Sequence, residues 1–208
     1  MLRRTLFCAG YIRELLMDHN NFLNVVESNP IIASVKNDEG LERALKTDVE
    51  IIFILYGDVC SIPAITEKIR AAGKISMVHM DLVGGLNHAS ESAVDYIRQF
   101  TSADGIITTK SGLVEKASRI GLRTVLRFFI LDSMALENIR RQSKNTIQPD
   151  LIEILPGGVR SKVIHEIEAI VKVPLIAGGL ISTKEDVVYA LNSGVLAISS
   201  TNEEVWKM

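Results

Sequence analysis

The sequence is poor in the residues that build disulfide-rich, metal-binding and membrane-spanning proteins. Its 208 residues include only two cysteines, Cys8 and Cys60, and four histidines that lack the spacing of metal ligands. Two cysteines form neither a disulfide framework nor a zinc site, so we expect no metal, no cofactor, and two buried or partly buried thiols in a reducing cytoplasm. No apolar run reaches the roughly 18 residues of a membrane span, so we expect no membrane contact.

The N-terminus also lacks a secretory signal. Its apolar stretch runs only from Thr5 to Ala9, whereas a signal peptide needs an apolar region of about 7–15 residues. We therefore expect a cytoplasmic protein. Residues 1–28 are expected to form a helical extension, with an amphipathic helix from Leu2 to Val26. Met17 is an alternative start to Met1.

A strong excess of one charge is missing as well. The chain has 23 basic and 25 acidic residues and a formal net charge of −2, which gives no global positive field to attract nucleic acid. Basic residues do cluster locally, as at Arg140, Arg141 and Lys144. Such a cluster is typical of a solvated helix face, and the alternative is contact with RNA phosphates. No signature of an RNA-recognition module is present.

What the sequence does contain is a series of short apolar segments that end in polar or glycine-rich corners. Eight of them read as buried strands, at residues 30–35, 51–57, 75–81, 105–109, 124–130, 151–157, 174–179 and 195–200. Room for about one helix separates each from the next. This alternation predicts an α/β fold, a compact (β/α)8 TIM barrel, as a single domain over residues 1–208. A doubly wound open sheet is the alternative.

The helix signals between these strands are specific enough to test. Ser90 is a predicted N-cap, and Phe100 is assigned to the apolar stripe of the helix that follows it. Residues 182–185, Ser-Thr-Lys-Glu, have the spacing of a capping box. A short last helix is expected over residues 202–207.

The corners after the last strands predict a phosphate site. Gly178 and Gly179 end the seventh strand and Ser199 and Ser200 end the eighth, where barrels often bind phosphate. Glycine lets the backbone approach an anion, and N–H groups and hydroxyls can donate hydrogen bonds to it. A second glycine pair after strand six, Gly157 and Gly158, is expected to form another wall of the site. The alternative is that these glycines only turn corners.

Polar side chains on otherwise apolar strands predict a polar cavity beside that phosphate. They are His79, Asp81, Lys110, Arg127 and Glu153, from four neighbouring strands. Ionised groups in a barrel need partners, because an unpaired buried charge is costly. A structural salt-bridge network is the alternative. Asp81 could serve as a general base and Lys110 as an acid or Schiff-base amine, but the sequence does not demonstrate this, and no catalytic residue is assigned.

These residues lie in segments that resemble a known family, the glycerol-3-phosphate-responsive antiterminators. The resemblance runs from about Asn29 to Asn202. Its segments are Asn29–Lys36, His79–Leu86, Asp104–Lys110, Arg127–Ser133, Glu153–Gly157 and Pro174–Ile181. Together and in this order they are fairly specific, although none of them is specific alone.

The resemblance implies a barrel that senses glycerol-3-phosphate and acts on a leader mRNA to prevent transcription termination in glycerol-uptake genes. The transcription machinery would be a possible further partner. Which residues contact RNA does not carry over. A homodimer is compatible with a chain that is 47% hydrophobic. Two alternatives stay open: a phosphosugar isomerase, epimerase or lyase on the same barrel, and a sensor that acts through a protein partner.

Overall fold

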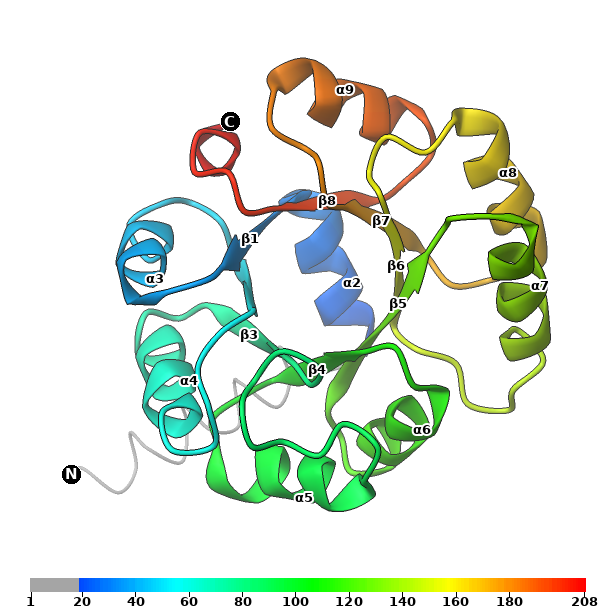
Figure 1. The fold of residues 1–208 in the computed structure, drawn as a ribbon. Coiled ribbons are helices and arrows are strands. Elements are labelled where there is room, and N and C mark those ends of the chain that lie inside the picture. The colour runs from blue at the N-terminus through cyan, green and yellow to red at the C-terminus, as the bar shows by residue number, and fades with distance from the viewer. Residues whose placement is uncertain (1–18) are drawn as a thin grey trace.

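A computed structural model of the chain describes residues 19–208, which contain a closed barrel of eight parallel strands (Figure 1). Neighbours in the sequence are neighbours in the barrel, and β8 closes it by pairing with β1. The strands are β1 (Ile31–Val35), β2 (Ile51–Ile54), β3 (Ile75–His79), β4 (Gly105–Thr108), β5 (Arg123–Phe129), β6 (Leu151–Leu155), β7 (Leu175–Gly178) and β8 (Ala197–Ser200). The predicted TIM barrel is confirmed.

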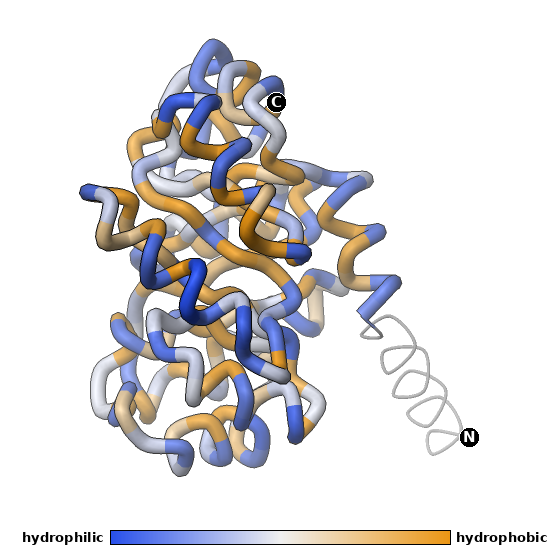
Figure 2. Tube along the Cα trace, turned by 90° about the vertical axis from the view of Figure 1, so that its right-hand side faces the viewer, coloured by the Kyte–Doolittle hydropathy of each residue, from blue (hydrophilic) through white to orange (hydrophobic). Residues whose placement is uncertain are grey.

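Helices follow the strands and form the outer ring seen in Figure 1. They are α3 (Asp38–Ala44), α4 (Ile62–Ala71), α5 (Glu91–Phe100), α6 (Ser111–Arg119), α7 (Ser133–Gln142), α8 (Ser161–Ile170) and α9 (Lys184–Asn192). Hydrophilic and hydrophobic residues alternate along the outer helices in Figure 2, as expected for helices that bury one face against a barrel. None of the helices in residues 19–208 is long and apolar enough to cross a membrane.

The strands are apolar on both faces because both faces are buried. One set of side chains, which includes Ile32, Phe53 and Met77, fills the barrel interior. The alternate side chains, such as Ala33, Ile54 and Val78, pack under the outer helices. This arrangement explains the continuous apolar runs, since a parallel sheet covered on both sides needs no polar face.

A further helix, α2 (His19–Ser28), closes the N-terminal end of the barrel. Phe22 and Val26 are fully buried and belong to the same cluster as the interior side chains. His19 Nδ1 lies 2.7 Å from Oδ1 of Asp150, which directly precedes β6. The helical extension is thus confirmed from His19 onward, while the earlier part of the predicted helix, Met1, Met17 and Cys8 lie outside the described residues.

The capping predictions are confirmed in one helix and corrected in another. Ser90 is the N-cap of α5, where its side chain accepts the N–H of Ser92. The capping box of α9 lies one residue later than predicted, because Thr183 is the N-cap and the reciprocal acid is Asp186. The same spacing occurs at Ser182 and Glu185 and at Thr183 and Asp186, and the second pair forms the box.

Three further expectations are wrong. Phe100 is 63% exposed and stacks on Tyr96 instead of packing under α5. Cys60 is exposed, since it lies in the polar turn before α4 rather than in a strand. The last helix is only a 3-10 turn, η1 (Val205–Lys207).

Candidate functional site

A cavity of about 110 Å³ lies at the C-terminal mouth of the barrel, on the side of β6, β7 and β8. Its lining residues are Ser34, Leu55, Arg127, Glu153, Leu155, Gly179, Leu180, Ile181, Ser199, Ser200 and Thr201. Five of these were predicted as site residues. Parallel barrels place their working loops at this end of the strands, so the position agrees with the prediction.

The floor of this cavity is a buried ion pair. Arg127 on β5 and Glu153 on β6 are register partners, and Arg127 Nε donates to Glu153 Oε2 across 2.6 Å. The hydroxyl of Ser199 donates to the other carboxylate oxygen at 2.6 Å. Glu153 is fully buried, so both of its oxygens have the partners that a buried carboxylate needs.

Gly178 makes room for this arrangement. A Cβ atom at this position would lie 2.4 Å from Glu153 Oε1 and 2.6 Å from Ser199 Oγ. Glu153 and Ser199 are both buried, so neither side chain can move away to make room for a Cβ. Gly178 therefore acts by its small size, and its role is to admit the Glu153 carboxylate.

The loop after β7 adopts an unusual backbone conformation. Gly179 and Leu180 have φ values of 73° and 59°, which lie in the left-handed region. For a residue with a side chain this costs about 1–2 kcal/mol, and Leu180 is 85% exposed, so packing does not offset the cost. Such strain concentrates at ligand-binding positions. Gly157 N–H donates to Gly179 O at 2.8 Å and joins the loop after β6 to this loop.

The serine hydroxyls at the end of β8 already donate within the protein. Ser199 donates to Glu153, and Ser200 donates to the carbonyl of Ile181 at 2.7 Å. A hydroxyl has one hydrogen to donate. The expectation that both hydroxyls donate to a phosphate therefore does not fit this geometry, although both residues line the cavity.

His79 is buried, and its charged form is disfavoured. Burial, together with the nearby Arg127 guanidinium, lowers the pKa of His79 to about 3, so the ring is neutral near pH 7. Nδ1 accepts the backbone N–H of Asp81 at 3.2 Å, which places the ring proton on Nε2. Within residues 19–208, this Nε2 and Asp81 Oδ2 are buried without a hydrogen-bond partner.

The structure separates the other predicted residues from the cavity lining. Lys110 is exposed at the N-cap of α6, and Gly158 is exposed with open space beside it. His79 and Asp81 face each other at the end of β3, 3.7 Å apart from Nδ1 to Oδ2. They do not belong to the lining, and the polar groups thus form two neighbouring subsets rather than one cluster.

Sequence reasoning missed several lining residues. Ser34 is a buried polar residue on β1, within the segment Asn29–Lys36, and its isolation among apolar residues was a usable signal. Leu180 gave no signal, because it contributes through its backbone conformation, whereas Thr201 belongs to a run of three hydroxyl residues at the end of the eighth strand, which was a usable signal. In the described part of the chain, no group of three or more His, Cys, Asp or Glu side chains could hold a metal ion.

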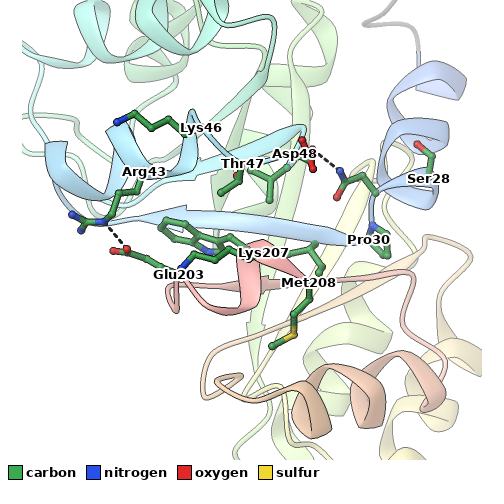
Figure 3. A pocket seen from close by; sticks show the side chains of 13 residues that line it. Ser28, Pro30, Arg43, Lys46, Thr47, Asp48, Glu203, Lys207 and Met208 are labelled. Carbon is green, nitrogen blue, oxygen red and sulfur yellow. Dashed lines mark hydrogen bonds and ion pairs between the residues drawn. The ribbon is translucent and has the colours of Figure 1, made fainter.

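A larger groove, of about 680 Å³, lies away from the mouth, between α3 and η1 (Figure 3). Two of its lining residues, Arg43 and Glu203, form an ion pair with each other, and Lys207 pairs with Glu204 outside the lining. Asn29 bonds to the Asp48 carbonyl at 2.8 Å. Within the described residues 19–208, the lining of this groove has neither a buried side-chain atom without a hydrogen-bond partner nor a positive φ. The smaller mouth cavity is therefore the better candidate site.

Comparison with known proteins identifies the group to which this barrel belongs. Residues 31–206 match the model of the glycerol-3-phosphate responsive antiterminators. The chain belongs to this family. It is 31% identical to the glycerol uptake operon antiterminator regulatory protein from Listeria monocytogenes, with a TM-score of 0.79, over 85% of this chain and 94% of that one. A glycerol uptake operon antiterminator-related protein from Thermotoga maritima is 33% identical, with a TM-score of 0.76, over 86% and 99% of the two chains.

Among curated relatives, the antiterminator-family chain matches the uncharacterized protein YgcP of Escherichia coli (strain K12). The two are 39% identical over 186 residues, which are 89% of this chain and 96% of the relative. Enzymes share the barrel at much lower identity: deoxyribose phosphate aldolase from Aeropyrum pernix is 12% identical with a TM-score of 0.64. That likeness shows the fold alone.

Proposed function

We propose that this antiterminator-family barrel binds glycerol-3-phosphate in the mouth cavity and, in its bound form, binds a leader mRNA to prevent termination. The observation that carries the proposal is the combination of a small polar floor and a rim of strained backbone at the C-terminal ends of β7 and β8. Binding pockets for drug-sized ligands are about 300–1,000 Å³. A cavity of about 110 Å³ therefore suits a triose-sized ligand and not a nucleotide.

Backbone N–H groups are the best phosphate donors in this geometry. Within residues 19–208, the N–H groups of Gly179, Leu180 and Thr201 have no backbone or side-chain acceptor. They belong to two loops that border the same cavity. The phosphate would sit between these loops, as in many barrels. The Ser199 and Ser200 hydroxyls would then hold the loops in place rather than donate to the phosphate.

The polar floor would recognise the glycerol hydroxyls. Arg127 can donate from the guanidinium nitrogens that do not bond to Glu153, because only its Nε does so and its side chain is 10% exposed. Within residues 19–208, Nε2–H of His79, the last residue of β3, and Oδ2 of Asp81, just after β3, are buried without hydrogen-bond partners. They are a donor and an acceptor that lack protein partners. We place them beside the ligand rather than in direct contact with its phosphate.

Calorimetric titration with glycerol-3-phosphate tests the ligand, with glycerol as control. The proposal expects a saturable isotherm that requires the phosphate and disappears in Gly179→Asp, which places an anion at the phosphate site. Asp tolerates a left-handed backbone better than most residues, so this variant is expected to stay folded. Unchanged affinity in Gly179→Asp would remove the phosphate assignment. Steady heat after each injection would indicate turnover and favour the phosphosugar-enzyme alternative.

Filter binding with leader RNA tests the output. Ligand can favour an RNA-competent state only by binding it more tightly than the other state, and the coupling is reciprocal. Glycerol-3-phosphate should therefore strengthen RNA retention by the same factor by which RNA strengthens ligand binding. Absent or salt-insensitive retention would favour a protein partner. A homodimer and contact with the transcription machinery stay predictions.

A further inference from the structure

Three large apolar side chains lie exposed beside the mouth of the barrel. Phe129 at the end of β5 is 52% exposed, Leu131 in the following loop is 83% exposed, and Met134 in the first turn of α7 is 72% exposed. They lie within six consecutive residues. Exposed apolar residues in a contiguous group, unlike scattered ones, mark interaction surfaces.

Cations without partners flank this apolar group on both sides. Lys110, after β4, is the N-cap residue of α6, and Arg160, after β6, is the N-cap residue of α8. Lys162 follows in the first turn of α8. All three are exposed, and none forms an ion pair with another residue of the described chain 19–208. Lys144 lies near the same end of α6, since it borders a groove with Ser111 and Gly112.

These cations stand where helix electrostatics disfavour them. The N-terminus of a helix carries a partial positive charge, so acidic residues stabilise it and basic residues do not. Helices α6 and α8 have no acidic residue in the first turn and no side-chain cap. By contrast, α3, α5 and α9 each begin with acidic residues. A bound polyanion would relieve the unfavourable charge at α6 and α8.

The charge at the mouth is therefore divided. Over β1 to β3, the corners and helix starts carry the four exposed acids Asp38, Glu39, Asp58 and Glu91 against one exposed cation, Lys36. Over β4 to β6, the acid at a corner is Asp132, and its Oδ1 is occupied as the α7 cap by the N–H groups of Met134 and Ala135. An anionic partner with apolar faces would fit the β4–β6 side and be repelled by the other.

We propose that this surface, the mouth arc, binds single-stranded leader RNA. We define the mouth arc as Lys110, Phe129, Leu131, Met134, Arg160 and Lys162. Bases would pack on Phe129, Leu131 and Met134, and phosphates would contact the cations, which is the usual combination in single-strand recognition. The inference rests on the proposed RNA-binding function and adds to it the face that RNA occupies.

The position also connects RNA to ligand. The loop after β6 leads into Arg160, and its Gly157 N–H bonds to Gly179 O in the loop that borders the cavity. A ligand that fixes Gly179 therefore acts on a loop joined directly to the mouth arc. Ligand binding at Gly179 can therefore affect the position of the mouth arc through this one hydrogen bond between the loops.

Fluorescence anisotropy with a labelled leader transcript of the glycerol-uptake genes tests the proposal, at saturating glycerol-3-phosphate. The first variant is Arg160→Glu with Lys162→Glu. Acidic residues favour a helix N-terminus, so this variant should fold at least as well as the wild type. The matched control is Arg98→Glu with Lys172→Glu, which changes the net charge equally at two exposed positions at the other end of the barrel, where α5 and α8 end. A third variant is Leu131→Ser with Met134→Ser.

The proposal expects the mouth variant to weaken RNA binding at least tenfold and to lower the salt slope by about 1.4, since each phosphate contact on a single strand contributes about 0.7. The control should change affinity less than threefold. The serine variant should weaken binding with an unchanged salt slope, because it removes apolar contacts only. The affinity for glycerol-3-phosphate, measured without RNA, should stay within about twofold in all of them.

Other outcomes would overturn the mouth arc. Equal losses in the mouth variant and the control would show only a general charge effect, and wild-type affinity in the mouth variant would place RNA elsewhere while leaving the proposed function intact. Intact RNA binding with lost antitermination in a transcription assay would assign the arc to a protein partner. Failure of the wild type itself to bind RNA would instead remove the proposed RNA function together with this inference.

Discussion

Arg127 and Glu153 form a buried ion pair between adjacent strands of the barrel, with 2.6 Å between Nε and Oε2. Glu153 has no exposed surface, and the side chain of Arg127 is 10% exposed. Removing two charges from water costs several kcal/mol each, and their attraction offsets this only when the geometry is good and the remaining hydrogen-bonding groups are satisfied. The hydroxyl of Ser199 supplies the second hydrogen bond to Glu153. The pair therefore positions the cavity floor more than it stabilises the fold.

This balance predicts a non-additive double-mutant cycle. Arg127→Met leaves an uncompensated buried carboxylate, so we expect the free energy of unfolding to fall by about 3–5 kcal/mol. Arg127→Met combined with Glu153→Leu removes both charges and should recover most of this loss. Urea unfolding of the single and double variants measures the coupling. If the double variant were as unstable as the sum of the single ones, the pair would not act as a unit.

The barrel could be predicted from sequence because each strand is a short apolar run that ends in a polar or glycine-rich corner. All eight predicted strands exist, with ends that differ by up to three residues. The errors lie where local signals compete. Residues 182–186 contain overlapping capping patterns, and Thr183 with Asp186 forms the better reciprocal pair.

The site could be predicted only in part. The sequence indicates which strand a polar residue lies on or follows, but not whether its side chain faces the cavity or the solvent. Polar residues on buried strands predict Arg127 and Glu153 as site residues, and the corner after the eighth strand predicts Ser199; the structure brings the three together. Lys110 stands out equally, yet it points to solvent because it follows the strand. Leu180 contributes through its positive φ, which cannot be predicted from a residue pattern.

Gly178 and Gly158 should respond oppositely to alanine. A Cβ at Gly178 would collide with Glu153 and Ser199, whereas a Cβ at Gly158 meets nothing within 4 Å. We expect Gly178→Ala to lower the free energy of unfolding by about 1–3 kcal/mol through overpacking and to weaken glycerol-3-phosphate binding. Gly158→Ala should be neutral or slightly stabilising, because it restricts the unfolded chain. Denaturant unfolding and calorimetry measure both effects, and equal behaviour of the two variants would contradict the packing role of Gly178.

Leu180→Gly should stabilise the protein although it removes a large side chain. Leu180 is 85% exposed and left-handed, so glycine relieves about 1–2 kcal/mol of strain and loses about 0.4–1 kcal/mol through the freer unfolded chain. The two ranges differ by about 0–1.6 kcal/mol, so the expected net gain is about 0.8 kcal/mol at their midpoints. Leu131→Gly is the matched control, since Leu131 is 83% exposed and has no positive φ, and it should destabilise. Thermal unfolding of both variants shows whether each substitution raises or lowers the stability. A loss of stability in Leu180→Gly would contradict the prediction.

His79 should make the free energy of unfolding depend on pH between about 6.5 and about 3. Its folded pKa is lowered to about 3 by burial and by Arg127, from an ordinary value of 6.5. Below pH 6.5 the unfolded chain therefore binds a proton that the folded protein excludes, so stability is full above this value and falls as the pH drops toward 3. At pH 5 the loss is about 2 kcal/mol, from 1.36 kcal/mol for each unit below 6.5.

His79→Gln removes this contribution while other groups still titrate, so the difference between variant and wild type isolates it. Urea unfolding at pH 7.5, 6 and 5 should show the stability of the wild type falling by about 2 kcal/mol more than that of the variant. Parallel slopes for the two proteins would show that His79 becomes protonated without cost in the folded state, and the neutral donor that we place beside the ligand would have to be abandoned.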